Sequence, residues 1–420
     1  MSISLNDWLT FLENKNKFSG PRNLKTIKDV YKKICKRNIA SKVISIAGTN
    51  GKGTTAECLS DLLISRDKKV GLYTSPHLFR FNERIKVNTN PISDDLIVKS
   101  FELVHEVTLD KSLSYFDFIT LAALHYFSTL ELDYVILEVG LGGRLDPINI
   151  IDADISILTN IDLDHTNLLG KSKKEIAIEK VAIFRKDKIA IIGQRDIDLD
   201  VKKVLNSKGA IIYQMGQDFT FFNESSMSKG VYKFYRSDRA VNVSEIINPS
   251  LSIESFCMAL TACHLLDHKL INKDAEILNK IIIPYRRQLI KNRVLVDVSH
   301  NPAASKFLAD FIKKEYYGKR KLHAVIGLMS DKDALGIIEP MIPLISSWYT
   351  TSPNIYRAEN KEYLKELIIK IKEQDVMSIE GVDKAVKLAL NNHPNEDIIV
   401  IFGSFHTVSE AHQVINNIEI

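Results

Sequence analysis

The sequence has few cysteines, and none stands in a metal-binding pattern. Its 420 residues include four cysteines, at positions 35, 58, 257 and 263, and no two of them form a CxxC pair. In a chain of this length, such sparse cysteines indicate reduced thiols rather than a disulfide framework or a zinc site. We therefore expect all four to be structural residues.

Long apolar runs and blocks of like charge are also absent. No stretch reaches the roughly 18 apolar residues of a membrane-spanning helix, and the first twenty residues are too polar for a signal peptide. Lysine and arginine (56) nearly balance aspartate and glutamate (52), and the charges are interspersed. There is no fixed-period repeat. We expect a cytoplasmic monomer that binds neither nucleic acid nor membranes.

Short apolar runs alternate with amphipathic, helix-length segments along most of the chain. This alternation is typical of βα units and predicts α/β folding with mostly parallel sheets, whose ligands bind at the carboxyl ends of the strands. Residues 216–248 differ, because they read as short alternating strands before a helix at 252–268. The expected strands of the two series are 43–47, 69–73, 134–138, 155–159 and 189–193, then 293–298, 322–328, 346–351, 375–379 and 397–403.

A glycine-rich turn follows the first strand. The segment GTNGKGTT (48–55) lies between an apolar strand and a helical segment, so its backbone amides, the helix N-terminus and Lys52 can surround an anion. We interpret it as a triphosphate-binding loop, with a plain glycine turn as the alternative. The segment GLGGRL (140–145) lacks the third glycine of a dinucleotide-binding fingerprint, which disfavours a nicotinamide enzyme.

Three residues after later strands carry possible chemistry. Glu138 ends an expected strand, where its carboxylate can hold magnesium, although a solvated edge charge fits the same position. His165 follows another expected strand and is either a ligand or a hydrogen-bonded structural residue. By its own sequence context, Lys180 on a helix reads as a solvated charge.

Together these segments resemble the Mur ligase superfamily, and within it the dihydrofolate synthase/folylpolyglutamate synthase family. The resemblance covers nearly the whole chain. Its motifs appear in family order, and they include IAGTNGKGTT (46–55), YTSPHLFRFNERIKV (73–87), SYFDFITLAAL (114–124), LEVGLGGRLD (137–146), DLDHTNLLG (162–170), IEKVAIFR (178–185), VDVSHNPAA (296–304) and FGSFHTV (402–408).

The resemblance implies two domains, ATP and two magnesium ions. The domains would be an N-terminal P-loop ATPase-type domain with a mostly parallel sheet (1–284) and a smaller, Rossmann-like C-terminal α/β domain (285–420). Lys52, His165 and Lys180 would be catalytic, with Lys180 carbamylated so that it offers metal an oxygen ligand. The implied contacts are Thr49, Asn50, Gly51, Lys52, Gly53, Thr54, Arg286, Asp297 and His300 for the nucleotide, Ser75, Glu138, His165 and Lys180 for metal, and Ser114, Tyr115, Phe116, Asp117, Leu145, Asp146 and Pro147 for the pterin.

The sequence departs from the family pattern near two of these sites. Pro147 and Ile148 stand where the family has LDATN, and Ser252 stands where an asparagine near the nucleotide base is expected. The shape of the pterin pocket and the adenine contact therefore stay open.

The implied reaction joins L-glutamate to dihydropteroate or a reduced folate. ATP would phosphorylate the substrate carboxylate, and the glutamate amine would then displace phosphate from the acyl phosphate. Closure of the two domains would complete the nucleotide site and exclude water. The alternatives are another Mur-type amino-acid ligase, although only about 42 residues precede the first strand, and a nucleotide-binding ATPase without ligase activity.

Overall fold

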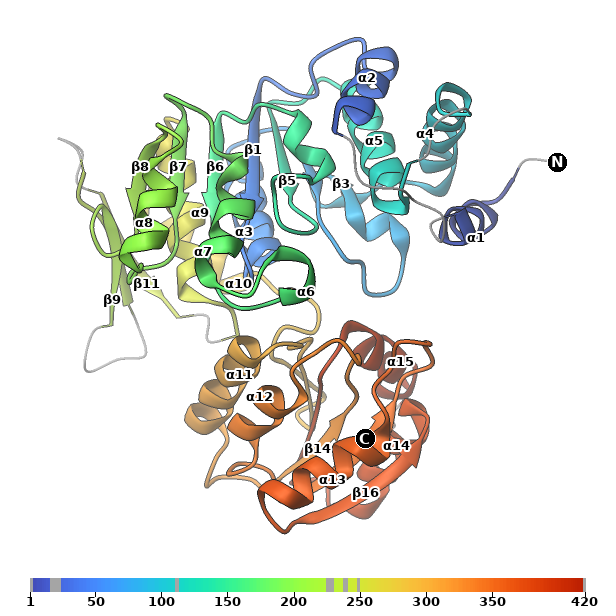
Figure 1. Cartoon of the computed structure of the whole chain (residues 1–420). Coiled ribbons are helices and arrows are strands. Elements are labelled where there is room, and N and C mark those ends of the chain that lie inside the picture. The colour runs from blue at the N-terminus through green and yellow to red at the C-terminus, as the bar shows by residue number, and fades with distance from the viewer. Residues whose placement is uncertain are drawn as a thin grey trace. The chain divides into compact units, whose positions relative to one another are not determined.

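The computed structural model describes residues 3–15, 24–109, 113–223, 230–236, 241–247 and 250–417. The chain divides into two compact units, coloured from blue to yellow and from amber to red in Figure 1. One unit comprises Met1–Asn248 and Ser252–Ile281, and the other comprises Pro249–Leu251 and Ile282–Ile420. No helix in the described ranges is both long enough and apolar enough to cross a bilayer.

The first unit is built on an eight-stranded sheet with the order β4-β3-β2-β5-β1-β6-β7-β8. Six of these strands run parallel, which confirms the predicted sheet, whereas β3 and β4 add an antiparallel edge. Sequence reasoning missed these two because they are too short to show an apolar run, and it also missed the parallel edge strand β8. The strands are β1 (Lys42–Ala47), β2 (Val70–Tyr73), β3 (Ile85–Val87), β4 (Asn90–Pro91), β5 (Tyr134–Glu138), β6 (Ile155–Leu158), β7 (Ile189–Ile192) and β8 (Ile211–Gln214).

Helices cover both faces of this sheet, and its central strands are mostly apolar and buried. All five residues of β5 are buried, as expected for a parallel strand that is covered on both sides. Helices α3, α9 and α10 pack together on one face, and the other face carries the remaining helices (Figure 1). The helices are α1 (Leu5–Lys15), α2 (Leu24–Ile34), α3 (Lys52–Ile64), α4 (Asp94–Val107), α5 (Tyr115–Ser128), α6 (Thr166–Leu169), α7 (Lys173–Lys180), α8 (Leu199–Asn206), α9 (Ile253–Leu265) and α10 (Lys273–Lys280).

A separate three-stranded antiparallel sheet stands beside α9, where the polar stretch predicted short strands. Its order is β11-β10-β9, with β9 at Phe219–Asn223, β10 at Gly230–Phe234 and β11 at Val241–Ile246. The buried hydroxyl of Tyr232 on β10 is 2.9 Å from that of Thr261 on α9, which fixes the small sheet against the helix.

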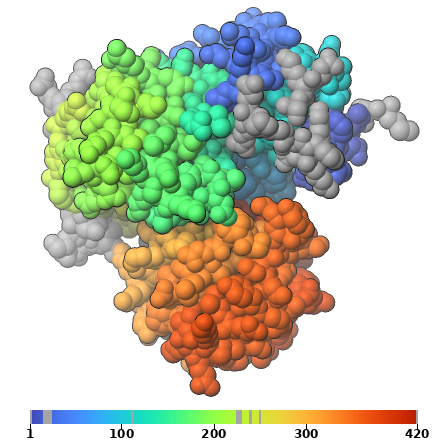
Figure 2. Space-filling model, viewed as in Figure 1, coloured from blue at the N-terminus to red at the C-terminus, as the bar shows by residue number. Residues whose placement is uncertain are grey.

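The second unit contains a six-stranded sheet with the order β12-β13-β17-β14-β15-β16, parallel except for β12. Its atoms pack as one contiguous body (Figure 2), and Trp348 and Phe402 lie fully buried in its core. This confirms the smaller α/β domain. Its elements are β12 (Gln288–Ile290), β13 (Val294–Val296), α11 (Pro302–Glu315), β14 (Leu322–Ile326), α12 (Ala334–Ile338), β15 (Ser347–Ser352), α13 (Lys361–Ile371), β16 (Asp375–Glu380), α14 (Val382–Asn392), β17 (Ile398–Phe402) and α15 (Phe405–Asn416).

Candidate active site

The glycine-rich turn joins β1 directly to α3. Gly51 caps α3 with a left-handed backbone (φ 81°), and a Cβ at Gly48 would lie 1.7 Å from the hydroxyl oxygen of Thr159. Both positions therefore require glycine. The first N–H groups of α3 have no partner within the helix, so this turn offers the donors of a phosphate-binding loop.

Residues just after β6 hold this loop in place. The side-chain oxygen of Asn160 accepts hydrogen bonds from the backbone amides of Thr49 (3.2 Å) and Asn50 (2.9 Å). The hydroxyl of Thr159 donates to the carbonyl of Asn50 at 2.6 Å. Sequence reasoning did not select Thr159 or Asn160, although their place at the carboxyl end of a strand was an available signal.

Two lysines converge on the same loop. The Lys52 ammonium donates to the carbonyl oxygens of Gly48 (3.2 Å) and Thr49 (3.3 Å), and the Lys180 amine donates to Gly48 at 2.8 Å. Lys180 is only 4% exposed. Its sequence context suggested a solvated charge, and that alternative is wrong because α7 ends against the loop.

Burial and charge change the protonation of Lys180. Desolvation and the nearby Lys52 ammonium lower its pKa to about 7, against an opposing effect of Asp164. A large fraction of this amine is therefore neutral near pH 7, which is unusual for a lysine.

Glu138 and Ser75 lie together beside the start of α3. The Ser75 amide donates to a carboxylate oxygen of Glu138 at 2.9 Å, and a Cβ on Gly53 would be 3.5 Å from that same oxygen. Glu138 is 4% exposed, so the alternative of a solvated edge charge does not hold. Hydroxyl and carboxylate oxygens at this edge suit a hard divalent cation.

His165 occupies a strained backbone position at the start of α6. Its φ is 49°, in the left-handed region, and its amide donates to the carboxylate of Asp164 at 2.8 Å. The ring is exposed, and Nε2 lies 3.9 Å from the same carboxylate. Asp164 thus touches His165 and acts electrostatically on Lys180, which links the two predicted metal ligands.

The predicted pterin segment forms the start of α5. Ser114 caps the helix by accepting from the Asp117 amide at 3.1 Å, and the Ser114 amide donates back to Asp117 Oδ2 at 3.2 Å. The other carboxylate oxygen of Asp117, Oδ1, is buried with no hydrogen-bond partner. A buried acceptor without a donor is costly unless a ligand supplies one.

Phe116 and Tyr115 lie beside this acceptor on α5. The Phe116 ring packs so closely on Gly140 that a Cβ there would be 2.3 Å away. Burial raises the pKa of Tyr115, against the opposing charge of Arg84.

Asp146 braces its own loop. Its two carboxylate oxygens accept from the amides of Gly140 (3.0 Å), Leu141 (3.1 Å) and Ile148 (3.1 Å), and the residue has no exposed surface. In this conformation the carboxylate orders the GLGGRLD turn. Pro147 begins a 3₁₀ helix at Pro147–Ile150, a position that proline favours.

Of the predicted nucleotide residues of the second unit, Arg286 precedes β12, whereas Asp297 and His300 follow β13. Arg286 stacks over the ring of Phe405 at 5.4 Å, and the His300 ring lies 5.6 Å from the same ring. Asp297 is 7% exposed and accepts from the amides of Arg287 and Ser299 at 2.9 and 2.7 Å. Phe405, which sequence reasoning did not select, thus gathers two of the three residues.

The hydrogen bonds of the Ser252 hydroxyl lie at the start of α9 and not at the phosphate loop. Ser252 caps α9 by accepting from the Ser255 amide at 3.2 Å and donates to Glu254 at 2.7 Å. Ser255, one turn further on, reaches the carbonyl of Gly51 at 3.5 Å.

Comparison with known proteins accounts for this arrangement. The Mur ligase middle domain matches residues 46–258, and the Mur ligase glutamate ligase domain matches residues 285–405. The dihydrofolate synthase/folylpolyglutamate synthase of Buchnera aphidicola subsp. Acyrthosiphon pisum is 37% identical over 97% of this chain and 98% of its own length. The chain belongs to the dihydrofolate synthase/folylpolyglutamate synthase family of Mur ligases.

Solved structures agree with this membership. Escherichia coli FolC in complex with DHPP and ADP has a TM-score of 0.91 at 32% identity, with 98% of each chain covered. A bifunctional folylpolyglutamate synthase/dihydrofolate synthase with Mn, AMPPNP and L-glutamate bound has a TM-score of 0.88 at 31% identity, with 98% of each chain covered. As a member of the dihydrofolate synthase/folylpolyglutamate synthase family, this chain is an ATP-dependent ligase that uses a divalent metal ion. A switch ATPase without ligase activity is therefore disfavoured.

Proposed function

We propose that this chain joins L-glutamate to dihydropteroate and to reduced folates through an acyl phosphate, and that Lys180 serves as a carbamate. The family membership supports the ligation. The burial of Lys180 beside Lys52 and the phosphate loop is the observation that supports the carbamate. Residues 1–284 would form the ATP-binding domain and residues 285–420 the ligase domain.

The environment of Lys180 favours carbamate formation. The ammonium first loses a proton. The neutral amine nitrogen then attacks the carbon of CO2 and loses a second proton, so that a cationic side chain becomes an anionic carbamate. With a pKa of about 7, the amine is available for this step. The change also replaces the repulsion between Lys52 and Lys180 with an attraction.

The donors in the first unit fit two divalent cations. Glu138 and Ser75 would offer oxygen ligands to one, and His165 with a Lys180 carbamate would offer an imidazole and an oxygen to the other. When bound, the metal would neutralise charge on the ATP phosphates. Lys52 would turn from the loop carbonyls that it contacts in the free protein to the phosphate oxygens.

The start of α5 supports the pterin assignment. The unpaired Oδ1 of Asp117 is a buried acceptor in the segment that the family motif assigns to the pterin, whose ring carries N–H donors. Asp117 is therefore a better candidate for direct recognition than Asp146, whose oxygens already accept three backbone amides.

A phosphate-release assay tests the proposal. Purified protein with ATP and magnesium should release phosphate only when both glutamate and a pteroate or folate are present, and mass spectrometry should show the substrate gaining one glutamyl residue. Dihydropteroate and tetrahydrofolate, assayed separately, distinguish one activity from two. ATP hydrolysis that needs neither cosubstrate would contradict the proposal.

A further inference from the structure

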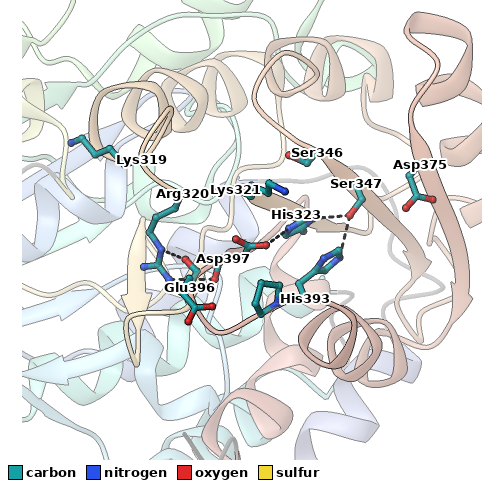
Figure 3. A pocket seen from close by; sticks show the side chains of 11 residues that line it. Lys319, Arg320, Lys321, His323, Ser346, Ser347, Asp375, His393, Glu396 and Asp397 are labelled. Carbon is teal, nitrogen blue, oxygen red and sulfur yellow. Dashed lines mark hydrogen bonds and ion pairs between the residues drawn. The ribbon is translucent and has the colours of Figure 1, made fainter.

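A second cluster of chemically active side chains lies in the second unit, away from the residues discussed so far. Among the described residues, His323, His393 and Asp397 form a group whose possible ligand atoms all lie within 4.8 Å of one another. They line a pocket of about 660 Å³ (Figure 3).

This pocket lies at the opposite end of the strands from the predicted nucleotide residues Asp297 and His300. His323 is the second residue of β14, Ser347 is the first residue of β15, and Asp397 immediately precedes β17. The pocket is therefore at the amino ends of these parallel strands, whereas Asp297 follows the carboxyl end of β13. The cluster has no part in the site described above.

We propose that His323, His393 and Asp397 bind a transition-metal ion of the zinc class. Two imidazoles and one carboxylate are the donor set that Zn²⁺, Co²⁺ and Ni²⁺ prefer, whereas Mg²⁺ prefers oxygen ligands alone. Three protein ligands beside an open pocket leave the fourth coordination position to water.

The distances suit such an ion. His323 Nε2 is 3.1 Å from Asp397 Oδ2. Two atoms bound to one tetrahedral zinc at about 2.0–2.2 Å lie about 3.4 Å apart, so a shift of a few tenths of an ångström admits the ion between them. The His323 and His393 rings are stacked with centroids 3.3 Å apart, and His393 must tilt out of this stack to coordinate.

The hydrogen bonds around the rings leave suitable nitrogen atoms free. If His323 Nε2 donates to Asp397, its Nδ1 must accept from the Ser347 hydroxyl, at 2.8 Å. His393 Nε2 then donates to Ser347 (3.2 Å) or Tyr349 (2.9 Å). This leaves His393 Nδ1 unprotonated, and a change of tautomer at His323 frees its Nε2.

The surroundings hold the cluster in position. Arg293 donates to the carbonyl oxygens of Leu390 (2.6 Å) and His393 (2.8 Å), which fixes the end of α14. Arg320 donates to carbonyl oxygens of the turn that carries Asp397. Outer hydrogen bonds of this kind orient the ligands of metal sites.

The charges around the pocket do not exclude a cation. Three basic residues (Lys319, Arg320 and Lys321) are balanced by three acidic residues (Asp375, Glu396 and Asp397). The guanidinium of Arg320 donates to backbone carbonyl oxygens and not to the carboxylate of Asp397. That carboxylate is directed at His323 (Figure 3).

Zinc titration of the full chain tests this site. Tag-free protein, stripped with EDTA and kept in millimolar Mg²⁺ to occupy the hard-cation site, would be titrated with ZnCl₂ by calorimetry. Wild-type protein should bind one more zinc ion than His393→Gln or Asp397→Asn, and zinc should raise the unfolding temperature of wild type but not of these two variants. Ser347→Ala should retain the site with about 10–100-fold weaker affinity.

The control is His406→Gln, which changes an exposed histidine of the same unit and should bind zinc like wild type. Co²⁺ gives an independent reading, because wild type should develop visible absorption bands that both ligand variants lack. Equal zinc stoichiometry and affinity in wild type, His393→Gln and Asp397→Asn would overturn the proposal. Cobalt spectra that do not differ among them would overturn it as well.

Discussion

Lys52 and Lys180 donate to one and the same acceptor, the carbonyl oxygen of Gly48, at 3.2 and 2.8 Å. Two ammonium groups on one neutral acceptor repel each other. The pKa of Lys180 falls because burial and this neighbour both act against its charged form. The two lysines therefore have different roles. Lys52 stays a cation, and Lys180 becomes a neutral amine that can react.

Removing Lys180 should abolish most of the activity in a way that a small acid can reverse. We expect Lys180→Ala to lose at least about 100-fold in kcat, and formate or acetate at millimolar concentrations to restore part of it by replacing the carbamate oxygen. Lys52→Ala should show no such rescue. A fully active Lys180→Ala protein would show that the lysine is only structural.

Lys52→Ala should lower turnover by at least about 100-fold, because one preorganised charge that stabilises the transferring phosphoryl group is lost. The unfolding temperature should change little, since Lys52 contacts loop carbonyls rather than core side chains. Lys69→Ala, at an exposed position before β2, is the matched control. Near wild-type turnover in Lys52→Ala would remove this residue from the phosphate site.

Glu138→Gln should raise the magnesium concentration needed for half-maximal activity and lower kcat, because a hard cation loses an anionic ligand. The amide oxygen of glutamine can still accept from the Ser75 amide, so the fold should persist. The test is a magnesium titration of initial rates beside a thermal melt. A variant that melts early but has a normal magnesium requirement would contradict metal binding.

Asp117 and Asp146 should respond differently to conversion into asparagine. Asp117→Asn should raise the KM for dihydropteroate by about 10-fold or more and leave the KM for ATP unchanged. The reason is that an N–H donor of the pterin ring would lose its charged acceptor. Asp146→Asn should mainly lower the unfolding temperature, because an NH2 group would face backbone amides. The reverse pattern would return the pterin contact to Asp146.

Asp61 gives a pH-dependent prediction for the fold itself. Burial and the charge of Glu57 raise its pKa from 3.8 to about 6. Between pH 3.8 and about 6 the folded state binds more protons than the unfolded state. The charged form of Asp61 therefore destabilises the folded state by an amount that is absent at low pH and grows as pH rises. Asp61→Asn should therefore stabilise the protein by up to about 3 kcal/mol at pH 7 and by much less at pH 4. Equal effects at both pH values would refute this.

The sequence predicts most of the parallel strands, because each is an apolar run between helical segments, but it misses β8 at the edge of the first sheet. It does not predict β3, β4 or β12, which have only two or three residues and pair at sheet edges. The phosphate loop was recognisable because its chemistry is local in the chain.

Contacts between distant segments were not predictable. Neither the hydrogen bonds of Asn160 to the loop 110 residues earlier nor the burial of Lys180 follows from local pattern, because both arise where strand ends meet. Asp146 shows the reverse difficulty. Its motif predicted ligand binding, and only three-dimensional contacts reveal that backbone amides occupy its oxygens.

The hydrogen bonds from Asn160 and Thr159 have a consequence for how tightly nucleotide binds. They hold Thr49 and Asn50 in place in the free protein, so the entropy cost of ordering this loop is met during folding rather than at binding. Affinity for ATP should accordingly depend on residues that never touch it. Asn160→Ala should weaken nucleotide binding. The loop would keep the same contacts to nucleotide, but it would no longer be preorganised and would have to be ordered on binding.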